Sequence, residues 1–267
     1  MLKFKEYIRP ESLDEAYRLN QKRSSRILGG MMWLKMSRST VGSVIDLGGL
    51  GLDYVNESES EFSIGAMTSL RTMETHVGLN EYTNGAVKDC LSPIVGVQFS
   101  YTASVGGTVF GRFGFSDLIT LLLALDAKVE LHAAGIIPIA DFVTMKRDRD
   151  ILVRVIIEKK PVRAVYLSQR NTKTDFPVLT CAAASDGQRL TAEIGARPGI
   201  AKPIILDMTA IRAAYADGTL RELCEKAAAG IGYSSNMRAG ADYRKHIAAV
   251  LMRRACEKII AKEDAAE

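Results

Sequence analysis

The chain has 267 residues, of which 47% are hydrophobic and 25% charged, and its formal net charge at pH 7 is +4. This composition is typical of a globular protein large enough for two domains, and so small a net charge indicates neither a nucleic acid nor a membrane as a partner. No run approaches the roughly 18 to 20 apolar residues of a membrane-spanning helix, and the N-terminus lacks the apolar core of a signal peptide, so we expect a cytoplasmic protein.

The cysteines and histidines show no spacing typical of a metal site. The sequence has no CxxC pair, no two histidines at a ligand spacing, and no nucleophile motif with a partner histidine. We therefore predict four reduced thiols, no metal site or iron–sulfur cluster in this chain, and no catalytic residue. The residues concerned are Cys90, Cys181, Cys224, Cys256, His76, His132 and His246.

The first part of the chain predicts a small mixed lobe. Ser12 with Glu15 forms a capping box that starts a helix, and the pair Gly29 and Gly30 follows an apolar run as the first of two glycine turns. Alternating and apolar runs predict strands at 1–7, 26–28 and 44–47.

The following part contains a second glycine pair, Gly106 and Gly107. Without side chains these residues can adopt positive φ and leave backbone N–H groups open to a phosphate, although most such pairs only form turns. Ser116 and Asp117 stand before an apolar run, so Asp117 either caps a helix or points at a ligand held by the glycine loop. Around them we expect strands at 62–66 and 128–131 and helices at 69–76, 82–91 and 118–125.

Charged residues at 146–150 mark the expected junction with a C-terminal half. There the dipeptide Asp186-Gly187 between two apolar runs predicts a β-hairpin. Apolar residues of the last helix repeat at three- and four-residue steps, so one of its faces is expected to pack on a sheet. The predicted strands are 152–157, 164–167, 177–185, 189–194 and 204–206, and the predicted helices are 219–229 and 241–262.

The stretch 104–127 resembles a motif of the molybdopterin dehydrogenase flavoprotein family, which includes the medium subunits of xanthine dehydrogenase and carbon monoxide dehydrogenase. In that family a Thr/Ser-Val/Ile-Gly-Gly loop precedes a Ser-Asp pair and a Leu-rich helix that ends in a Leu-Asp-Ala turn. The same residue types follow here in order and spacing. The Gly29-Gly30 turn, the phrase IGAMTSL at 64–70 and the Arg-Ala and Tyr-Arg pairs within 238–244 extend the resemblance over nearly the whole chain.

The resemblance implies an α+β fold with two domains. The first is a FAD-binding domain of the PCMH or vanillyl-alcohol-oxidase type with two α/β lobes, and it is expected to cover 1–148, with lobes at about 1–58 and about 59–148. The second, expected at 149–267, is an antiparallel sheet with packed helices like the C-terminal domain of carbon monoxide dehydrogenase flavoproteins.

The resemblance also implies the function of a FAD-binding electron-transfer subunit in a xanthine dehydrogenase-like molybdenum hydroxylase. Its partners would be a molybdopterin-binding large subunit and a small subunit with 2Fe–2S clusters. Electrons would pass from those clusters through FAD to NAD+ or another acceptor. The alternative is a scaffold subunit that keeps the fold but has lost tight FAD binding, and a weaker third possibility is a standalone flavin reductase.

The resemblance assigns the cofactor-binding residues. Backbone amides at the two glycine turns would hold the pyrophosphate, and Asp117 would accept a hydrogen bond from a polar edge of the dinucleotide. Ile94 and Leu152 would pack against the flavin ring. Asp117→Ala is expected to weaken FAD retention and to leave the fold largely intact. The implied residues are Ile27, Leu28, Gly29, Gly30, Met31, Met32, Trp33, Ile94, Ser104, Val105, Gly106, Gly107, Thr108, Asp117 and Leu152.

The chain departs from the family pattern at several polar positions of this expected site. Thioethers replace hydroxyl, amide or carboxylate groups after the first glycine pair, and they cannot supply the same hydrogen bonds. For the segment at 31–33, a packed apolar cluster is as good an interpretation as flavin contact. The departures that motivate the scaffold alternative are Met31, Met32, Ser100, Tyr101, Thr108 and Leu167.

Overall fold

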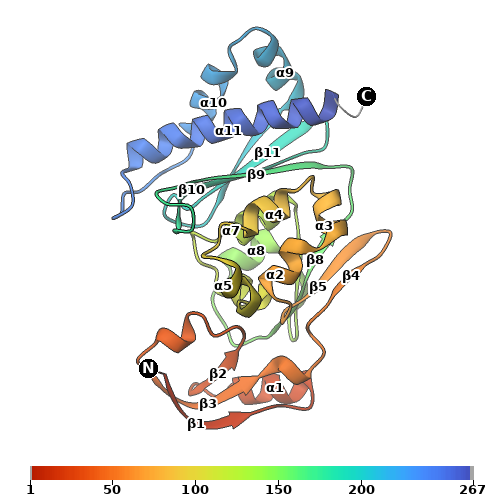
Figure 1. Ribbon diagram of the computed structural model, residues 1–267, viewed down its shortest axis with the longest axis vertical. Coiled ribbons are helices and arrows are strands. Elements are labelled where there is room, and N and C mark those ends of the chain that lie inside the picture. The colour runs from red at the N-terminus through yellow and green to blue at the C-terminus, as the bar shows by residue number, and fades with distance from the viewer. Residues whose placement is uncertain (1, 265–267) are drawn as a thin grey trace. The chain divides into compact units, whose positions relative to one another are not determined.

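The computed structural model describes residues 2–264 (Figure 1). Contacts divide the chain into two compact units. The first unit comprises 2–76, 97–111 and 126–158, and the second comprises 77–96, 112–125 and 159–264. The predicted boundary at 148 and 149 between two domains remains a prediction.

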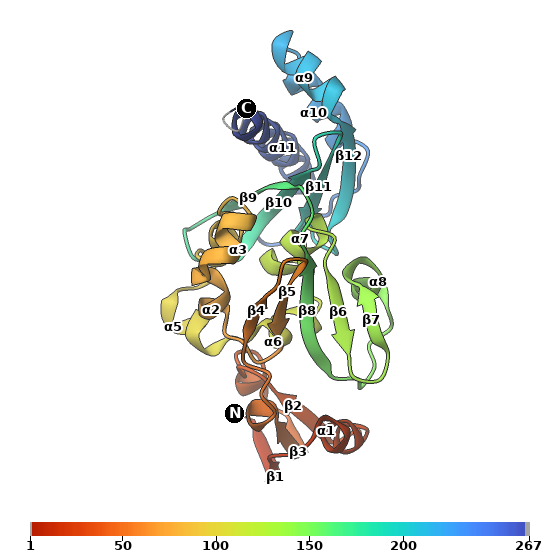
Figure 2. The same ribbon diagram turned by 90° about the vertical axis from the view of Figure 1, so that its right-hand side faces the viewer.

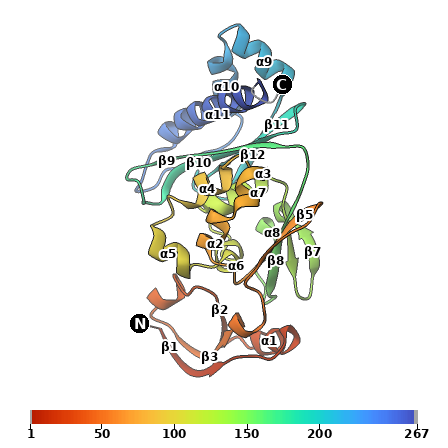
Figure 3. The ribbon, with the colours of Figure 1, turned by 45° about the vertical axis from the view of Figure 1, so that its right-hand side comes forward.

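A parallel sheet with the order β1-β3-β2 opens the first unit, as Figure 3 shows. Helix α1 packs on β2 and β3 through Ala16, which is fully buried with Ile45. The predicted N-cap is confirmed, because the Ser12 hydroxyl accepts from the Glu15 N–H at 3.1 Å. The elements are β1 Lys3–Ile8, α1 Leu13–Asn20, β2 Ser25–Leu28, β3 Thr40–Asp46 and the short 3-10 helices Leu34–Met36 and Leu47–Gly49.

The second sheet of this unit is antiparallel, with the order β4-β5-β8-β6-β7 (Figure 2). Strand β8 lies in the middle and pairs with both β5 and β6, and its successive residues 155–157 are buried on both faces, which explains its mostly apolar sequence. The strands are β4 Val55–Glu57, β5 Glu61–Gly65, β6 Lys128–Leu131, β7 Gly135–Pro138 and β8 Leu152–Glu158. The helices of the unit are α2 Leu70–Thr75, α5 Val97–Thr102, α6 Val105–Phe110 and α8 Ile139–Thr144.

The charged segment before β8 is held inside the first unit. The Arg149 guanidinium donates to the carbonyls of Asn20 and Arg23, both at 2.8 Å, and so satisfies acceptors at and beyond the end of α1. The Asp150 carboxylate accepts from the N–H groups of Ala133 and Ala134. Side-chain to backbone bonds therefore anchor this expected junction.

The second unit is built around a meander with the order β12-β11-β10-β9. The predicted hairpin is confirmed: Ser185 pairs with Leu190, Gly187 has φ +87°, and the Asp186 carboxylate accepts from Arg189 N–H at 2.7 Å. The strands are β9 Arg163–Arg170, β10 Pro177–Ser185, β11 Arg189–Gly195 and β12 Lys202–Asp207. Helices cover both faces of this sheet.

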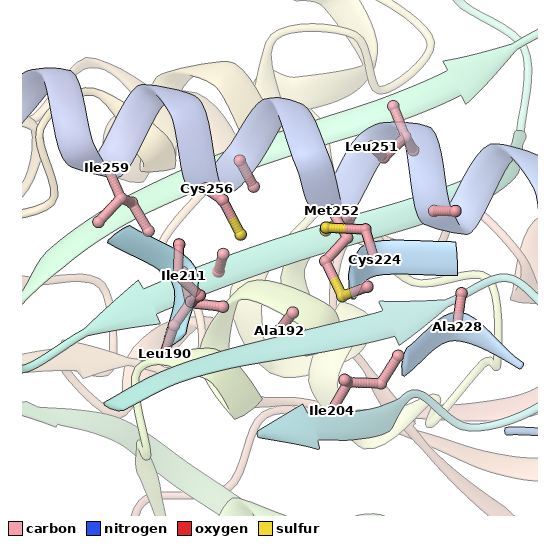
Figure 4. Packing of buried hydrophobic residues seen from close by; sticks show 14 of the residues in the cluster. Leu190, Ala192, Ile204, Ile211, Cys224, Ala228, Leu251, Met252, Cys256 and Ile259 are labelled. Carbon is pink, nitrogen blue, oxygen red and sulfur yellow. The ribbon is translucent and has the colours of Figure 1, made fainter. Parts of the chain in front are cut away.

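On one face lie α9, α10 and α11, which share an apolar core with the strands. Figure 4 shows Met252, Cys256 and Ile259 of α11 directed toward the strands, near Cys224 of α10 and Ile211 of α9. The amphipathic pattern predicted for the last helix is thereby confirmed. The helices are α9 Met208–Ala216, α10 Leu220–Ala228 and α11 Ala241–Asp264.

On the opposite face lie α4 Ala86–Leu91 and α7 Asp117–Ala124, with α3 Val77–Tyr82 beside α4. Helix α7 crosses β10 and β11, and the Thr120 hydroxyl lies 3.1 Å from the Thr180 hydroxyl. A Cβ at Gly195 would collide with both of these hydroxyl groups, so glycine permits this close packing. The predicted α+β fold, with two mixed lobes followed by a helix-covered antiparallel sheet, is confirmed.

Glu193 of β11 is a buried carboxyl group, 6% exposed, on the strand face opposite the main apolar core. Its Oε2 atom has no hydrogen-bond partner among residues 2–264. Burial raises the pKa of Glu193 to about 7, against a smaller lowering by Lys202. Since the pKa of the folded protein lies above the ordinary glutamate pKa of 4.5, this group's contribution to stability is complete below pH 4.5 and is lost as pH rises through 7.

Glu193→Gln is expected to remove this loss of stability at rising pH. Because the amide cannot ionise, the free energy of unfolding of the wild type should fall relative to the variant by on the order of 3 kcal/mol between pH 5 and pH 8.5. Urea denaturation of both proteins across that range measures the difference. A constant difference across the range would show that the carboxyl group titrates normally.

Candidate cofactor site

The first glycine turn directly follows the parallel sheet. Strand β2 ends at Leu28, Gly29 and Gly30 follow, and Met31 adopts a left-handed conformation with φ +57°. An αR residue followed by a left-handed one turns successive N–H groups to the same side and forms an anion-binding nest. The left-handed Met31 after Gly30, whose φ is not positive, is compatible with that arrangement. Among residues 2–264, the N–H groups of Met31 and Met32 have no hydrogen-bond acceptor.

The second glycine pair lies in a helix. Ser104 is the N-cap of α6, and Gly106 and Gly107 occupy its first turn without positive φ. The expectation of a left-handed glycine loop is therefore wrong, and close approach explains Gly106 instead: a Cβ there would lie 2.6 Å from the Ala66 carbonyl oxygen. The amides of Val105 and Gly106 donate to Thr68 and Ala66 carbonyls at 2.9 and 2.8 Å.

The structure brings the two glycine turns together. The Ser104 hydroxyl accepts from the N–H of Gly107 at 3.2 Å and from that of Gly30 at 3.4 Å. A Cβ on Gly29 would lie 2.7 Å from the same hydroxyl, and one on Gly30 would lie 2.7 Å from Ala103 Cα. Glycine at 29 and 30 is thus what lets the first turn lie directly against the start of α6.

The donor set fits a pyrophosphate at the first turn. The amides of Met31 and Met32 can donate, and Gly107 is exposed with only the Ser104 hydroxyl near its missing Cβ. At the second turn the amides already donate within the protein, so their contact with phosphate remains a prediction. The Thr108 hydroxyl donates to the Ser104 carbonyl at 2.9 Å, and its oxygen can still accept.

Some apolar residues around the first turn are packed in the first unit, and others are exposed. Met31 packs with Leu34 against the buried residues Leu28, Val41 and Val44, as the apolar-cluster interpretation expects. Trp33 does not share this burial, because 47% of its surface is exposed. Ile27 packs against another cluster of the first unit, around Ile45.

The remaining predicted residues lie elsewhere. Leu152 of β8 is 4% exposed and pairs with Leu131 in the first unit. Ile94 and Asp117 belong to the second unit, where Ile94 is partly buried just before Val95, whose φ of +54° is unusual for a β-branched residue. The contacts of Ile94, Asp117 and Leu152 with a cofactor remain predictions.

Asp117 takes part in a buried polar network of the second unit. Ser116 is the N-cap of α7, since its hydroxyl accepts from Ile119 N–H at 3.3 Å, and the Asp117 carboxylate accepts from the Tyr166 hydroxyl and the Arg170 guanidinium. The side chains of Asp117 and Arg170 are each 7% exposed. Burial raises the pKa of Asp117 to about 6, with Arg170 and Tyr166 opposing the shift.

The sequence interpretation missed Tyr166 and Arg170 as partners of Asp117. The available signal was the two-residue alternation of β9, which places Tyr166, Ser168 and Arg170 on one face, opposite the face of Val165. Arg170 also donates to the Ser168 hydroxyl at 3.3 Å. This face of β9 meets α4 and, through Asp117, the start of α7, and only the tertiary structure shows those contacts.

The described part of the chain lacks features of two other classes of protein. No group of three or more histidine, cysteine or acidic residues within 2–264 is arranged to hold a metal ion. No helix within the same range is both long and apolar enough to cross a bilayer. All four cysteines are buried and free.

Comparison with known proteins identifies the family. A model of the FAD binding domain in molybdopterin dehydrogenase matches residues 2–159. The Escherichia coli (strain K12) protein YgfM is 24% identical over 196 residues, which cover 70% of this chain and 73% of that protein.

Solved structures confirm the fold over nearly the full length. Quinoline 2-oxidoreductase from Pseudomonas putida 86 contains a chain that matches with a TM-score of 0.81 at 19% identity, over 96% of each chain. Carbon monoxide dehydrogenase from Oligotropha carboxidovorans contains one with a TM-score of 0.80 at 22% identity, again over 96% of each. The resemblance inferred from the two glycine turns is confirmed, and the chain belongs to the FAD-binding flavoprotein family of the molybdopterin dehydrogenases, oxidoreductase components whose cofactor is FAD.

Proposed function

We propose that this chain is the FAD-binding electron-transfer subunit of a multisubunit, xanthine dehydrogenase-like molybdenum hydroxylase. Electrons pass from 2Fe–2S clusters of a small partner subunit through FAD to NAD+ or another acceptor, and a molybdopterin-binding large subunit carries the substrate chemistry. The observation that supports this most directly is the pair of glycine turns joined at Ser104, with the amides of Met31 and Met32 available beside them.

The residues of this chain act by binding and orientation. The Met31 and Met32 amides would donate to the pyrophosphate, and Gly29 and Gly30 keep that turn against α6. The Ser104 hydroxyl fixes the spacing of the two turns through its bonds to Gly30 and Gly107. FAD, when bound, supplies the redox chemistry, and the protein supplies its position and electrostatic surroundings.

The departures from the family pattern do not remove these backbone donors. Ser100 is 2% exposed, and its hydroxyl donates to the Val97 carbonyl at 2.9 Å, so it supports α5. Tyr101 is 65% exposed, and Met31 packs into the first unit. A backbone-based site therefore tolerates the changed side chains, which favours a FAD-binding subunit over a scaffold.

The cofactor content of the purified protein tests the proposal. We expect stoichiometric FAD, seen as a flavin absorption spectrum and identified by chromatography after release, in the chain purified with its co-expressed partner subunits. NADH-dependent reduction of the bound flavin then tests whether NAD+ is the acceptor. A folded but colourless chain within such a complex would establish the scaffold alternative instead.

A further inference from the structure

Four loops of the second unit meet at one end of its sheet. They are the segment before α7 (112–116), the β9–β10 turn (171–176), the β11–β12 connection (196–201) and the segment between α10 and α11 (229–240). Figures 1 and 3 show the β9–β10 turn and the segment leading into α11 at the same end of this unit. We call the surface of these four segments the loop face.

Backbone contacts tie the loops to one another. The Gly114 carbonyl accepts from Ala196 N–H at 2.9 Å, and a Cβ at Gly114 would lie 2.6 Å from the backbone of Gly199. The Arg197 carbonyl accepts from Ser234 N–H at 2.7 Å, and the Arg197 guanidinium donates to the Gly232 carbonyl at 2.6 Å. The loop face is therefore a single connected surface.

Arg244 braces the longest of these loops from beneath. Its side chain is fully buried and donates to the carbonyls of Val178, Ser234 and Ala239 at 2.9, 2.6 and 2.8 Å. It also donates to the Asn236 side-chain oxygen at 2.6 Å. A buried guanidinium with four such bonds holds its acceptors in one geometry, because losing them would leave its own buried N–H groups unsatisfied.

This braced loop presents an apolar side chain to solvent. Asn236 and Ala239 form a β-bridge, and Met237 at the tip between them is 93% exposed. Because its side chain lies in water, Met237 contributes no buried apolar contact to the stability of this chain. A single exposed apolar side chain is ordinary on a protein surface, but methionine is enriched at protein-binding surfaces, so the residues beside Met237 decide its meaning.

A row of three aromatic rings ends at the base of this turn. Phe113 stacks on Phe115 at 5.2 Å, and Phe115 contacts Phe176 at 4.9 Å between ring centroids. The Arg238 guanidinium lies 5.0 Å above the Phe176 ring and pairs with Asp175 at 3.3 Å. All three rings are only partly buried, so the loop face presents aromatic surface together with an arginine. Aromatic residues and arginine are enriched at the positions of protein interfaces that contribute most of the binding energy.

The charge of the loop face indicates the chemistry of its partner. Lys173, Arg197 and Arg238 are at least partly exposed there, against the single carboxylate of Asp175. Complementary charge steers association and fixes orientation. We propose that the loop face docks another protein subunit, which receives Met237 in an apolar socket bordered by acidic residues.

The identity of the docked chain as one of the partner subunits rests on the proposed function. The docking itself goes beyond that function, because the residues assigned to FAD binding at the glycine turns are not part of the loop face. The experiment therefore measures FAD content and subunit association separately.

The test compares Met237→Glu with the control Tyr215→Glu, which alters another exposed apolar side chain of the same unit, on α9. Each variant is co-expressed with the molybdopterin and 2Fe–2S subunits, and association is measured by interferometry at low and high salt. Met237→Glu should weaken association at least about tenfold through charge repulsion and loss of the apolar contact. Tyr215→Glu should match the wild type, and both variants should retain FAD.

Several outcomes would overturn the proposal. Unchanged association of Met237→Glu would remove the loop face from the interface, and wild-type association that strengthens with salt would exclude an acidic border. A homodimer of the isolated chain that Met237→Glu dissociates would make a second copy the occupant. If the wild-type chain assembles with neither subunit, the docking and the proposed function both fail, whereas loss of FAD with intact, Met237-dependent association affects the proposed function alone.

Discussion

Gly30→Ala is expected to abolish FAD binding and to destabilise the first unit. The added Cβ would collide with the Thr102 carbonyl group and lie 2.7 Å from Ala103 Cα. These are backbone atoms, so no side-chain rotation relieves the clash, and the two glycine turns must separate. We expect the free energy of unfolding to fall by about 3 kcal/mol, at the upper end for overpacking. FAD occupancy and urea denaturation of the purified variant measure both effects.

Gly107→Ala is the matched control for this variant. A Cβ at Gly107 would meet only the Ser104 hydroxyl, at 3.0 Å, and alanine is the better helix former by about 1 kcal/mol. The fold should therefore be retained. If FAD occupancy nevertheless falls, the phosphates pass over the start of α6. If Gly30→Ala kept full FAD occupancy, the contact between the turns would not be needed for the site.

Asp117→Ala is expected to destabilise the second unit strongly. The substitution removes the carboxylate that pairs with Arg170 and accepts from the Tyr166 hydroxyl, and Arg170 remains with a side chain 7% exposed. Breaking a buried ion pair from one side costs about 3 to 5 kcal/mol, because the remaining charge is uncompensated. The structure thus predicts a loss of stability where the sequence led us to expect a largely intact fold. Urea denaturation at pH 7.5 measures it.

The double substitution Asp117→Ala with Arg170→Met separates the effect of the unpaired Arg170 charge on stability from the effect of Asp117 on FAD binding. Removing both charges leaves no unpaired ion, so much of the lost stability should return. FAD occupancy of this double variant then reports on Asp117 without the complication of unfolding. Full occupancy would remove Asp117 from the cofactor site. A double variant no more stable than Asp117→Ala alone would show that packing around Arg170 outweighs its charge.

Local signals in the sequence predicted much of the fold. The hairpin at Asp186-Gly187 follows from turn chemistry, and α11 follows from its apolar repeat. Helix α9 was missed, although Asp207 caps it by accepting from Thr209 N–H at 2.7 Å and Gly218 follows its end with φ +76°. Helix α6 was missed because glycine has low helix propensity, and its packing against Ala66 outweighs that preference.

The sequence by itself determined the family, the fold class and FAD as the cofactor, because short motifs with fixed spacing encode the two glycine turns and the helix after Ser116. Only the tertiary structure decided how these residues are used. Whether an amide is free or already bonded depends on contacts between distant segments, such as Ser104 with Gly30. The same holds for Asp117, whose partners in β9 lie 49 and 53 residues along the chain, and for Met237, whose exposure depends on a turn braced by Arg244.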